Sequence, residues 1–537
     1  MDCRILSFRD LPHQPKLFVD FVDELEAARR FYAHPPTMEA VRHVARSLEY
    51  PAERRRVVAA ILKEQNQAFG AGAVTLANLE RLEKGAIAIT TGQQVGLFSG
   101  PAYSFYKALT AVQIAEELTQ EGIDAVPLFW MATEDHDLDE VRATNWFADG
   151  QLRRFELPVP PNVGQPVGRI PLGDAVAELT REAAASLEKL GDAAMARDLA
   201  ESYRPEETYG SAFGKLLTRL FAKQGLIFAE PLDPRLHAVA APVFRRVVEQ
   251  RDEVIAGLLQ REKELEIGGY DAQVKVTAKN TLLFRINGTG REAISASNGT
   301  FKTSTETWSK DELVRLVEAE PHTFSPNALL RPVVQDYLFP TAAYIGGPAE
   351  ISYFAQSEVL YRQVLGRMPV LLPRAGFTLV DAKASKLLQK YEMPIEDVWR
   401  GSQVVRKRME AHSVPPGLAE SLERAQKETE RMMEELGKEI GKLDATLLGA
   451  VENARSKISF QVENLRLKAG RALDERNNII GEHERYLESL LYPNKALQSR
   501  ELCLLPLLAR WGPDGMRELQ QHCSGKKLGH HFVIRIP

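Results

Sequence analysis

The amino-acid sequence predicts an α/β protein with a Rossmann-type parallel sheet, followed by a C-terminal α-helical coiled-coil arm. Short apolar strands at residues 86–90 and 124–132 flank a helix at 101–118, which is the order of a parallel βαβ unit. The arm is indicated by composition, because residues 401–459 contain no Phe, Trp or Tyr and residues 417–492 contain no proline. That is the composition of long helices without a globular core.

The overall composition excludes several classes of protein. The chain has 537 residues, 44% of them hydrophobic and 26% charged, which is typical of a globular protein with several structural units. Its formal net charge of −5 gives no bulk attraction to nucleic acid or to an anionic membrane. No apolar leader or membrane-length apolar run is present, and Cys3, Cys503 and Cys523 lack metal-ligand spacing. We therefore expect a cytoplasmic protein without a nucleic-acid partner, a membrane partner, disulfides or a structural zinc site.

The first strand of the core leads through a glycine-containing loop into a helix that begins near Pro101, a residue suited to a first helical turn. An alanine-rich helical segment is expected at 174–203. Further strands are expected at 225–229, 274–277, 281–285 and 369–373. The expected domains are a Rossmann-like core at 1–380 with insertions at about 151–210 and 235–330, the helical arm at 381–492, and a C-terminal segment at 493–537 that packs back on the core.

The arm shows a coiled-coil pattern interrupted once. Apolar residues recur at 3–4 spacing in two tracts: Met433, Leu436, Ile440, Leu443 and Leu447, then Ala454, Ile458, Val462, Leu465, Ala469 and Ala472. Between the tracts, Gly441 could end one helix and Asp444 could cap the next, which predicts an antiparallel hairpin. The hairpin could pack on itself with a solvated charged face. A two-helix hairpin buries little apolar surface, however, so we expect the arm to form a homodimer.

Three polar clusters carry the candidate chemistry, and the first follows strand 86–90. Its candidate binding residues are Thr91, Gly92, Gln93, Gln94, Ser99, Gly100, Tyr103 and Lys107. A loop that enters a helix N-terminus offers free N–H groups to phosphate or carboxylate, and Lys107 could add a cation. The spacing is neither G-x-G-x-x-G nor the Walker pattern. The alternative is that the glycines serve only the turn from strand to helix.

The second cluster follows strand 124–132. Trp130 is a candidate binding residue there, and the candidate catalytic residues are Glu134, Asp135, His136 and Asp137. Five carboxylates and one histidine occupy residues 134–140, and such density requires solvation, a cation or a substrate donor. His136 could act as a general base held by a carboxylate, or could join a divalent-metal site, although we assign no metal ligands. The alternative is a structural histidine that caps a loop.

The third cluster lies between residues 324 and 350. Its candidate binding residues are Arg331, Gln335, Asp336, Gly346, Gly347 and Glu350. Arg331 could present a fork to a carboxylate, with Gln335 and Asp336 one turn later on the same helix. Gly346 and Gly347 form a turn before a helix expected at 350–365. The alternative for Arg331 is an ordinary surface salt bridge.

Together, the motifs T-G-Q-Q-V-G-L-F-S-G-P-A-Y with Lys107, F-W-M-A-T-E-D-H-D-L-D-E, and R-P-V-V-Q-D with Y-I-G-G-P-A-E resemble the bacillithiol synthase family, the cysteine ligases of bacillithiol biosynthesis. The resemblance covers essentially the whole chain. It implies a Rossmann-type core with connecting-peptide insertions, as in class I aminoacyl-tRNA synthetases, and a coiled coil that makes a dimer. It also implies the last pathway step, in which the cysteine carboxyl is joined to the amine of glucosaminyl malate.

The implied reaction requires an activated cysteine carboxyl, so ATP or another nucleotide, including an ADP-type ligand, is expected, and Mg²⁺ could accompany it. Under this hypothesis the first cluster and Lys107 hold phosphates or the acyl group. The acidic cluster binds an amine with His136 as the candidate base, and Arg331 binds the malate carboxylates. No H-I-G-H motif stands at the first helix. The synthetase analogy therefore supports the fold more than an adenylation mechanism.

Two other functions remain open from the sequence. One is a catalytically inactive regulator that binds a nucleotide or metabolite, with the coiled coil as its interaction surface. The other is a metal-dependent hydrolase or transferase that uses the acidic cluster. The intact segments Gln93–Gln94 and Glu134–Asp137 favour an enzyme over the regulator.

Overall fold

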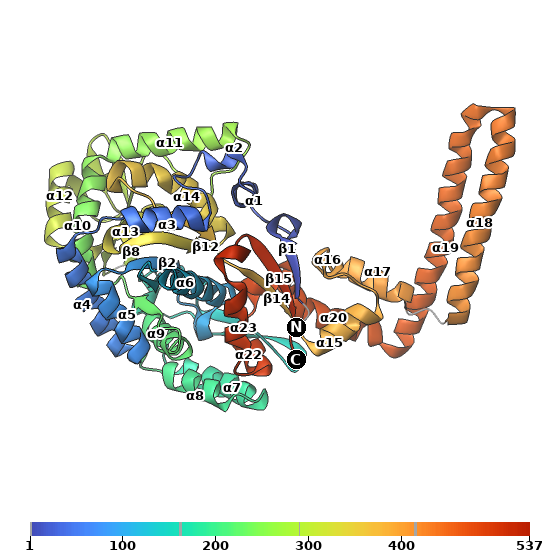
Figure 1. Ribbon diagram of the computed structural model, residues 1–537, viewed down its shortest axis with the longest axis horizontal. Coiled ribbons are helices and arrows are strands. Elements are labelled where there is room, and N and C mark those ends of the chain that lie inside the picture. Colours follow the sequence, from blue (N-terminus) through green and yellow to red (C-terminus); the bar gives the residue numbers. More distant parts are fainter. Residues whose placement is uncertain (1–2, 161–163, 289, 413–415) are drawn as a thin grey trace. The chain divides into compact units, whose positions relative to one another are not determined.

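The computed structural model describes residues 3–160, 164–288, 290–412 and 416–537 (Figure 1). The chain divides into two compact units. The core unit comprises Met1–Ala148, Arg153–Thr378 and Ser499–Ile534. The arm unit comprises Asp149–Leu152, Leu379–Gln498 and Arg535–Pro537. A C-terminal stretch of the chain thus belongs to the same unit as the N-terminus, and β1 (Cys3–Ser7) pairs antiparallel with β15 (His530–Arg535).

A parallel five-stranded sheet forms the centre of the core unit. Its strands, in spatial order, are β13 (Val370–Pro373), β12 (Thr341–Gly346), β2 (Ile87–Gln93), β3 (Ala125–Met131) and β6 (Ile227–Ala229). Numbered along the chain, this is the order 5-4-1-2-3, which is the Rossmann order read from one edge. The order reverses between β2 and β12, so a ligand crevice is expected beyond the carboxyl ends of these two strands. The Rossmann-type parallel sheet that the sequence predicts is confirmed.

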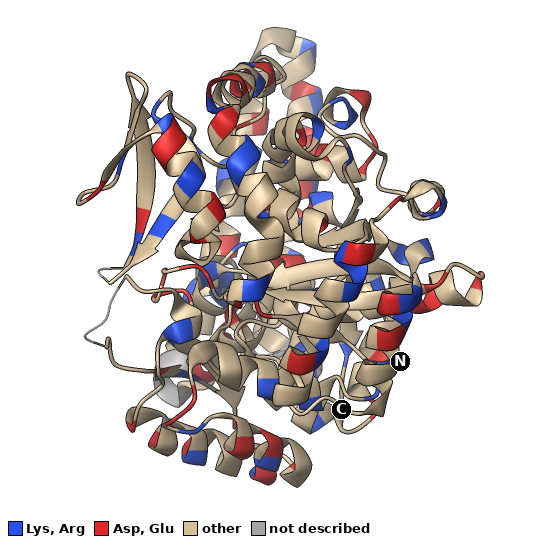
Figure 2. Ribbon diagram, turned by 90° about the vertical axis from the view of Figure 1, so that its left-hand side faces the viewer, with Lys and Arg blue, Asp and Glu red and all other residues tan. Residues whose placement is uncertain are grey.

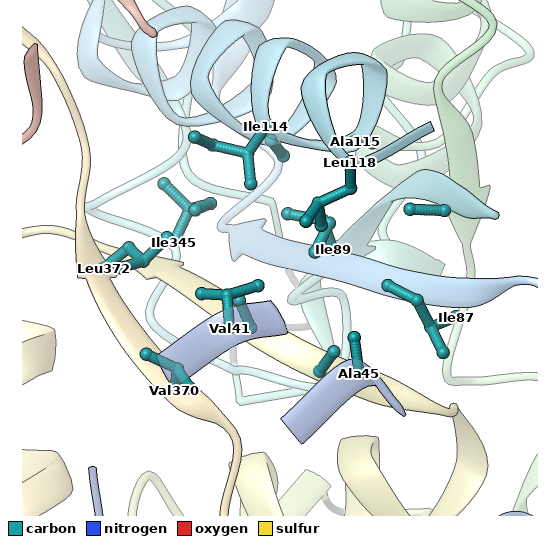
Figure 3. Packing of buried hydrophobic residues seen from close by; sticks show 14 residues of the cluster. Val41, Ala45, Ile87, Ile89, Ile114, Ala115, Leu118, Ile345, Val370 and Leu372 are labelled. Carbon is teal, nitrogen blue, oxygen red and sulfur yellow. The ribbon is translucent and has the colours of Figure 1, made fainter. Parts of the chain in front are cut away.

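Helices cover both faces of this sheet, as its continuous apolar strands require. The helix α6 (Tyr103–Gln120) packs on one face through Ile114 and Leu118, and α3 (Met38–Ser47) packs on the other through Val41 and Ala45 (Figure 3). Nearly the whole length of α6 is buried, because its sequence is apolar on most sides. The predicted unit of strand, helix and strand is β2, α6 and β3.

The remaining helices of the core unit surround these layers. Lys and Arg residues alternate with Asp and Glu residues along the helices (Figure 2). No helix among the described residues combines the length and the apolarity needed to cross a membrane. The helices are α1 (Lys16–Val22), α2 (Glu26–Arg29), α4 (Ala52–Ala68), α5 (Ala73–Lys84), α7 (Ala175–Lys189), α8 (Ala193–Ser202), α9 (Tyr209–Leu220), α10 (Pro234–Glu249), α11 (Arg251–Ile267), α12 (Lys310–Ala319), α13 (Arg331–Leu338), α14 (Pro348–Leu360), α21 (Gln498–Glu501), α22 (Leu505–Trp511) and α23 (Gly515–His522).

A second sheet, wholly antiparallel, lies between residues 280 and 326. Its order is β10 (Thr307–Ser309), β9 (Thr300–Lys302), β8 (Gly290–Ser297), β7 (Asn280–Asn287) and β11 (Phe324–Pro326). The predicted strand at 281–285 is part of β7. Other strands are β4 (Ala143–Ala148), β5 (Gln151–Glu156) and β14 (Gly376–Val380).

One of the predicted strands requires correction. Residues 274–277 form no strand, because the side chain of Gln356 takes the place of a neighbouring strand: its Oε1 accepts from Val274 N at 3.0 Å and its Nε2 donates to Val274 O at 2.7 Å. The helical segment predicted at 174–203 is confirmed as two helices, α7 and α8, separated at Gly191, whose φ is +101°. The helix predicted at 350–365 is also confirmed; it begins at Pro348 and ends in a π-helical turn, Tyr361–Leu365.

The arm unit contains the predicted antiparallel hairpin. Its long helices α18 (Pro416–Leu443) and α19 (Leu448–Asn477) lie side by side, and Gln426 Nε2 donates to Ser459 Oγ across them at 2.8 Å (Figure 1). Gly441 does not end the first helix, which continues to Leu443. Asp444 caps the turn by accepting from Thr446 N at 2.8 Å. The other helices are α15 (Ala382–Lys390), α16 (Ile395–Trp399), α17 (Ser402–His412) and α20 (Ile479–Leu491).

The hydrogen bonds from Gln356 should stabilise the segment that replaces the expected strand. Because Gln356 is fully buried, Gln356→Ala removes two hydrogen bonds and leaves a backbone N–H and C=O unsatisfied. We expect a loss of about 1–3 kcal/mol in the free energy of unfolding, measured as a lower thermal midpoint. Gln260→Ala, on the exposed face of α11, is the matched control. Equal midpoints for the two variants would contradict the assignment.

Candidate active site

A cavity of about 310 Å³ lies where the strand order reverses, beyond the ends of β2, β3, β12 and β13. We call it the switch-point cavity. Four cationic side chains and three carboxylates line it, together with amide, hydroxyl and small residues. The lining residues are Gln93, Gln94, Tyr103, Lys107, Asp135, Glu140, Ala328, Arg331, Gly347, Pro348, Ala349, Glu350, Tyr353, Arg374 and Arg500. All three polar clusters of the sequence contribute to this one cavity.

Lys107 is buried in the second turn of α6, with only 1% of its side chain exposed. Its Nζ lies 2.6 Å from Glu350 Oε2 and donates to Gln93 Oε1 at 3.0 Å and to the carbonyl of Gly92. Burial lowers the pKa of Lys107 to about 8, although the charge of Glu350 opposes this shift. Lys107 is therefore a positioned cation with a proton that is held less tightly than usual.

Glu350 is the anionic partner of Lys107 and lies in the first turn of α14. Its Oε2 accepts from Gly347 N at 2.8 Å, and its Oε1 accepts from Tyr344 Oη at 2.8 Å. Burial alone would raise the pKa of Glu350, but Lys107 and the Gly347 N–H hold it below the usual value. A carboxylate at a helix N-terminus also benefits from the helix dipole. Both Glu350 oxygens are thus engaged in holding the cavity wall.

Three arginines provide the remaining positive charge. Arg331 is the first residue of α13 and donates to Tyr353 Oη at 2.7 Å. Arg374 follows β13 directly, is 5% exposed and donates to Ala375 O at 3.0 Å, while Arg500 enters from α21. Burial lowers the pKa of Arg374 to about 10, and the nearby charge of Arg500 adds to the effect. Guanidinium groups in this arrangement suit the planar oxygens of carboxylate or phosphate.

The other side of the cavity offers acceptors. Gln94 Nε2 donates to Asp135 Oδ2 at 3.1 Å, and His136 N donates to Asp135 Oδ1 at 2.7 Å. Burial would raise the pKa of Asp135, but the hydrogen bonds from His136 and the charge of Arg291 hold it well below its usual value. Gln94 Oε1 is buried and has no hydrogen-bond partner among the described residues. An ammonium or amide N–H on a ligand would satisfy it.

His136 is not a free base in this structure, because its ring nitrogen Nδ1 has neighbours within the protein. Arg291, on β8, places Nη1 3.1 Å from His136 Nδ1 and 3.5 Å from Asp135 Oδ1. Its other nitrogens donate to Ser325 Oγ at 2.9 Å and to Pro326 O at 2.7 Å. His136 Nδ1 also lies 3.3 Å from Asp135 Oδ1, so this ring nitrogen contacts both a guanidinium group and a carboxylate. His136 does not line the cavity and acts on it through Asp135.

The rest of the acidic cluster is dispersed. Glu134 is buried with its Oε1 3.2 Å from His237 Nε2, and His237 Nδ1 contacts Pro321 O at 3.1 Å. Asp137 is exposed. Nowhere in the described parts of the chain do three or more His, Cys, Asp or Glu side chains gather as a set that could hold a metal ion. The hypothesis of a metal-dependent hydrolase or transferase therefore has no ligand set to support it.

The loop after β2 does not form the expected backbone cradle for an anion. Gly96 and Gly100 pack against each other: a Cβ on Gly96 would lie 2.8 Å from Gly100 Cα. The N–H of Leu97 donates to Val141 O at 2.8 Å and that of Ser99 to Tyr203 Oη at 3.3 Å. Because these backbone N–H groups already donate within the fold, they are not available to an anion. The positive groups that line the cavity are side chains of lysine and arginine.

Several other predicted site residues are structural. Thr91 donates to Ile345 O at 2.8 Å, which joins β2 to β12. A Cβ on Gly92 would lie 2.9 Å from Trp130 O, so Gly92 allows close packing of β2 on β3. Asp336 is buried and accepts from Tyr361 Oη and from Gln335 Nε2. The predicted residues outside the cavity lining are Thr91, Gly92, Ser99, Gly100, Trp130, Glu134, His136, Asp137, Gln335, Asp336 and Gly346.

Sequence reasoning missed Arg291, Tyr353, Arg374 and Arg500. Arg374 directly follows a predicted strand, so the rule that ligands bind at the carboxyl ends of parallel strands could have found it. Arg500 and Arg291 come from segments with no distinctive motif, and Arg291 is 155 residues from its partner His136. Only the folded chain brings them to the site.

The lowered pKa of Lys107 predicts a pH-dependent stability. Between its folded pKa of about 8 and the usual value near 10.5, the unfolded chain binds more protons, so this residue makes stability rise with pH. Relative to Lys107→Met, the wild type should gain up to about 1.4 kcal/mol per pH unit in this window. Thermal midpoints from pH 7.5 to 10 measure the difference, with exposed Lys63→Met as control. A difference that stays flat or falls would refute the shift.

Comparisons with known proteins agree with this architecture. The protein-family model described as "Bacillithiol biosynthesis BshC, N-terminal Rossmann-like domain" matches residues 1–375 of this chain. The family model of the BshC C-terminal coiled-coil domain matches residues 377–535. A relative from Koribacter versatilis (strain Ellin345) is 40% identical over 100% of this chain and 99% of its own length. A relative from Solibacter usitatus is 36% identical over 96% of each chain. A relative from Geobacillus thermodenitrificans is 28% identical over 98% of this chain and 99% of its own length. All three carry the name "Putative cysteine ligase BshC". The chain belongs to the BshC family of bacillithiol biosynthesis.

Proposed function

We propose that this chain is an amide-forming ligase that joins the carboxyl group of cysteine to the amine of glucosaminyl malate, the last step of bacillithiol biosynthesis. The name of the relatives as cysteine ligases supports the reaction class. One observation carries the assignment to a site: the switch-point cavity has a cationic wall suited to carboxylates and an acceptor wall suited to an amine. An amide ligase needs both groups held together.

The cationic wall fits the acidic parts of the substrates. The malate group has two carboxylates, and Arg331, Arg374 and Arg500 provide planar forks for them. Lys107 is already paired with Glu350, so it adds local positive charge with little freedom to move. On the other side, Gln94 Oε1 and Asp135 accept hydrogen bonds from an amine.

Amide formation makes a C–N bond between the amine and the cysteine carbonyl carbon, breaks the bond from that carbon to its leaving oxygen, and releases one proton from the amine. A free carboxylate does not react in this way, so we propose that a nucleoside triphosphate supplies the leaving group. The cationic wall suits its phosphates as well. Glu140 lines the cavity and is the candidate proton acceptor; it keeps contact with solvent, while partial desolvation and the charges of Asp137 and Asp135 raise its pKa.

The reaction is tested with purified protein, cysteine, glucosaminyl malate and ATP, which should yield bacillithiol and release AMP or ADP. Arg331→Lys loses the planar fork, so its kcat/KM for glucosaminyl malate should fall about 10- to 100-fold, mainly through KM. Arg362→Lys, an exposed arginine beside Glu358, is the matched control. Product formed without any nucleotide would refute activation, and unchanged kinetics in Arg331→Lys would refute the carboxylate site.

We also propose that the hairpin of α18 and α19 makes a homodimer with a second copy of this chain. Met433 is buried within one chain, but other residues of the predicted seam are not: Leu436 is 49% exposed, Leu443 82% and Leu465 59%. Apolar side chains repeated along a helix face in this way favour a further helix as partner.

Substitution within the full-length chain tests the dimer. Leu436→Glu combined with Leu465→Glu places charge on the exposed apolar face, and sedimentation should then report a monomer where the wild type is a dimer. The control is Lys438→Glu with Lys457→Glu, which changes exposed polar positions of the same helices. A dimer that persists in the leucine variant would contradict the proposal.

A further inference from the structure

A second cavity, of about 380 Å³, lies at the end of the parallel sheet where the strands begin. Tyr337 lines it just before β12, and Arg367 lines it just before β13, whereas the switch-point cavity lies where these strands end. The lining residues are Glu49, Arg54, Pro242, Val243, Arg246, Tyr337, Val364, Leu365 and Arg367. We call it the arginine cavity. It shares no residue with the switch-point cavity.

Three arginines from separate elements face this cavity, and their hydrogen bonds go to backbone carbonyls. Arg54 donates to Tyr337 O at 3.2 Å, and Arg246 donates to Val364 O at 2.5 Å. Arg367 donates to carbonyls at and just after the end of α13, among them Phe339 O at 3.3 Å. Within the described residues, none of the three guanidinium groups has a carboxylate within 4.0 Å.

This charge is only partly compensated: the buried carboxylate of Asp336 interacts electrostatically with Arg367 but does not line the cavity. Glu49 is the one carboxylate in the lining, so the cavity carries a net charge of about +2 in a chain whose total is −5. Like charges around one cavity repel each other and destabilise the folded state, unless an anion neutralises them. The fold also holds these groups in place. The Arg54 guanidinium lies 3.5 Å from the centre of the Tyr337 ring, and Arg367 is fixed by its backbone bonds.

We propose that the arginine cavity binds a small phosphate-bearing anion with at least two negative charges, such as a diphosphate group. Arginine is the side chain best suited to phosphate oxygens, and three forks around one space match a group with several of them. The cavity is larger than a single phosphate requires. Its apolar wall, made by Pro242, Val243, Val364 and Leu365, suits a non-polar portion of the same ligand. The site does not depend on the ligase reaction.

Calorimetric titration of the full-length protein with pyrophosphate tests this site. Arg246→Gln is the informative variant, because Arg246 is exposed on α10. Its pyrophosphate affinity should fall at least 10-fold. The matched control is the neighbour Arg245→Gln, whose guanidinium pairs with Glu249 and Glu318 outside the cavity and whose affinity should not change. Wild-type affinity in Arg246→Gln, or no pyrophosphate binding by the wild type at millimolar concentration, would overturn the proposal.

Further measurements distinguish the arginine cavity from the switch-point cavity, which is also cationic. Arg500→Gln should leave the Arg246-dependent binding event intact; its loss in that variant would place the anion in the switch-point cavity instead.

Without ligand, Arg246→Gln should unfold at a thermal midpoint no lower than that of Arg245→Gln, since the substitution relieves repulsion between the arginines. A lower midpoint would make Arg246 a structural residue. Malate binding as tightly as pyrophosphate would refute the phosphate class.

Discussion

The buried ion pair between Lys107 and Glu350 joins the two halves of the parallel sheet at the point where its strand order reverses. Lys107 comes from the helix after β2, and Glu350 comes from the helix after β12. Burying both charges is costly unless their remaining hydrogen-bonding groups are satisfied. The carbonyl of Gly92, the amide of Gln93, the N–H of Gly347 and the hydroxyl of Tyr344 satisfy them. The ion pair holds α6 and α14 together beside the cavity that the three arginines line.

Local sequence pattern was sufficient for the features that depend on near neighbours. The apolar strands, the helix between them and the charged hairpin were all predicted, and each has a pattern within one or two turns of chain. The candidate site was predicted in part: Gln94, Lys107, Asp135, Arg331 and Glu350 line one cavity. The strand at 274–277 was wrong because a distant side chain, Gln356, replaces the sheet neighbour that the pattern implied. Arg291 could not be found, because its role exists only through contacts made across the fold.

The carboxylates at residues 134–140 show how density in sequence differs from density in space. Glu134 turns inward to His237, Asp135 faces the cavity, and Asp137 turns to solvent. Neighbouring side chains after a strand end point in different directions, so a run of like charges is separated by the backbone itself. The charge that does reach the cavity comes mostly from single residues on separate elements. A cavity built in this way can be positive on one wall and negative on the other.

The short helix α13 has a consequence for which changes the chain tolerates. Its first residue, Arg331, faces the switch-point cavity, and Tyr337, near its last turn, faces the arginine cavity. Eight residues of helix span about 12 Å and turn about 100° per residue. One inserted or deleted residue would therefore rotate one of these side chains out of its cavity while the other stayed in place. The rotational phase of α13 is therefore a constraint on the length of the chain between the two cavities.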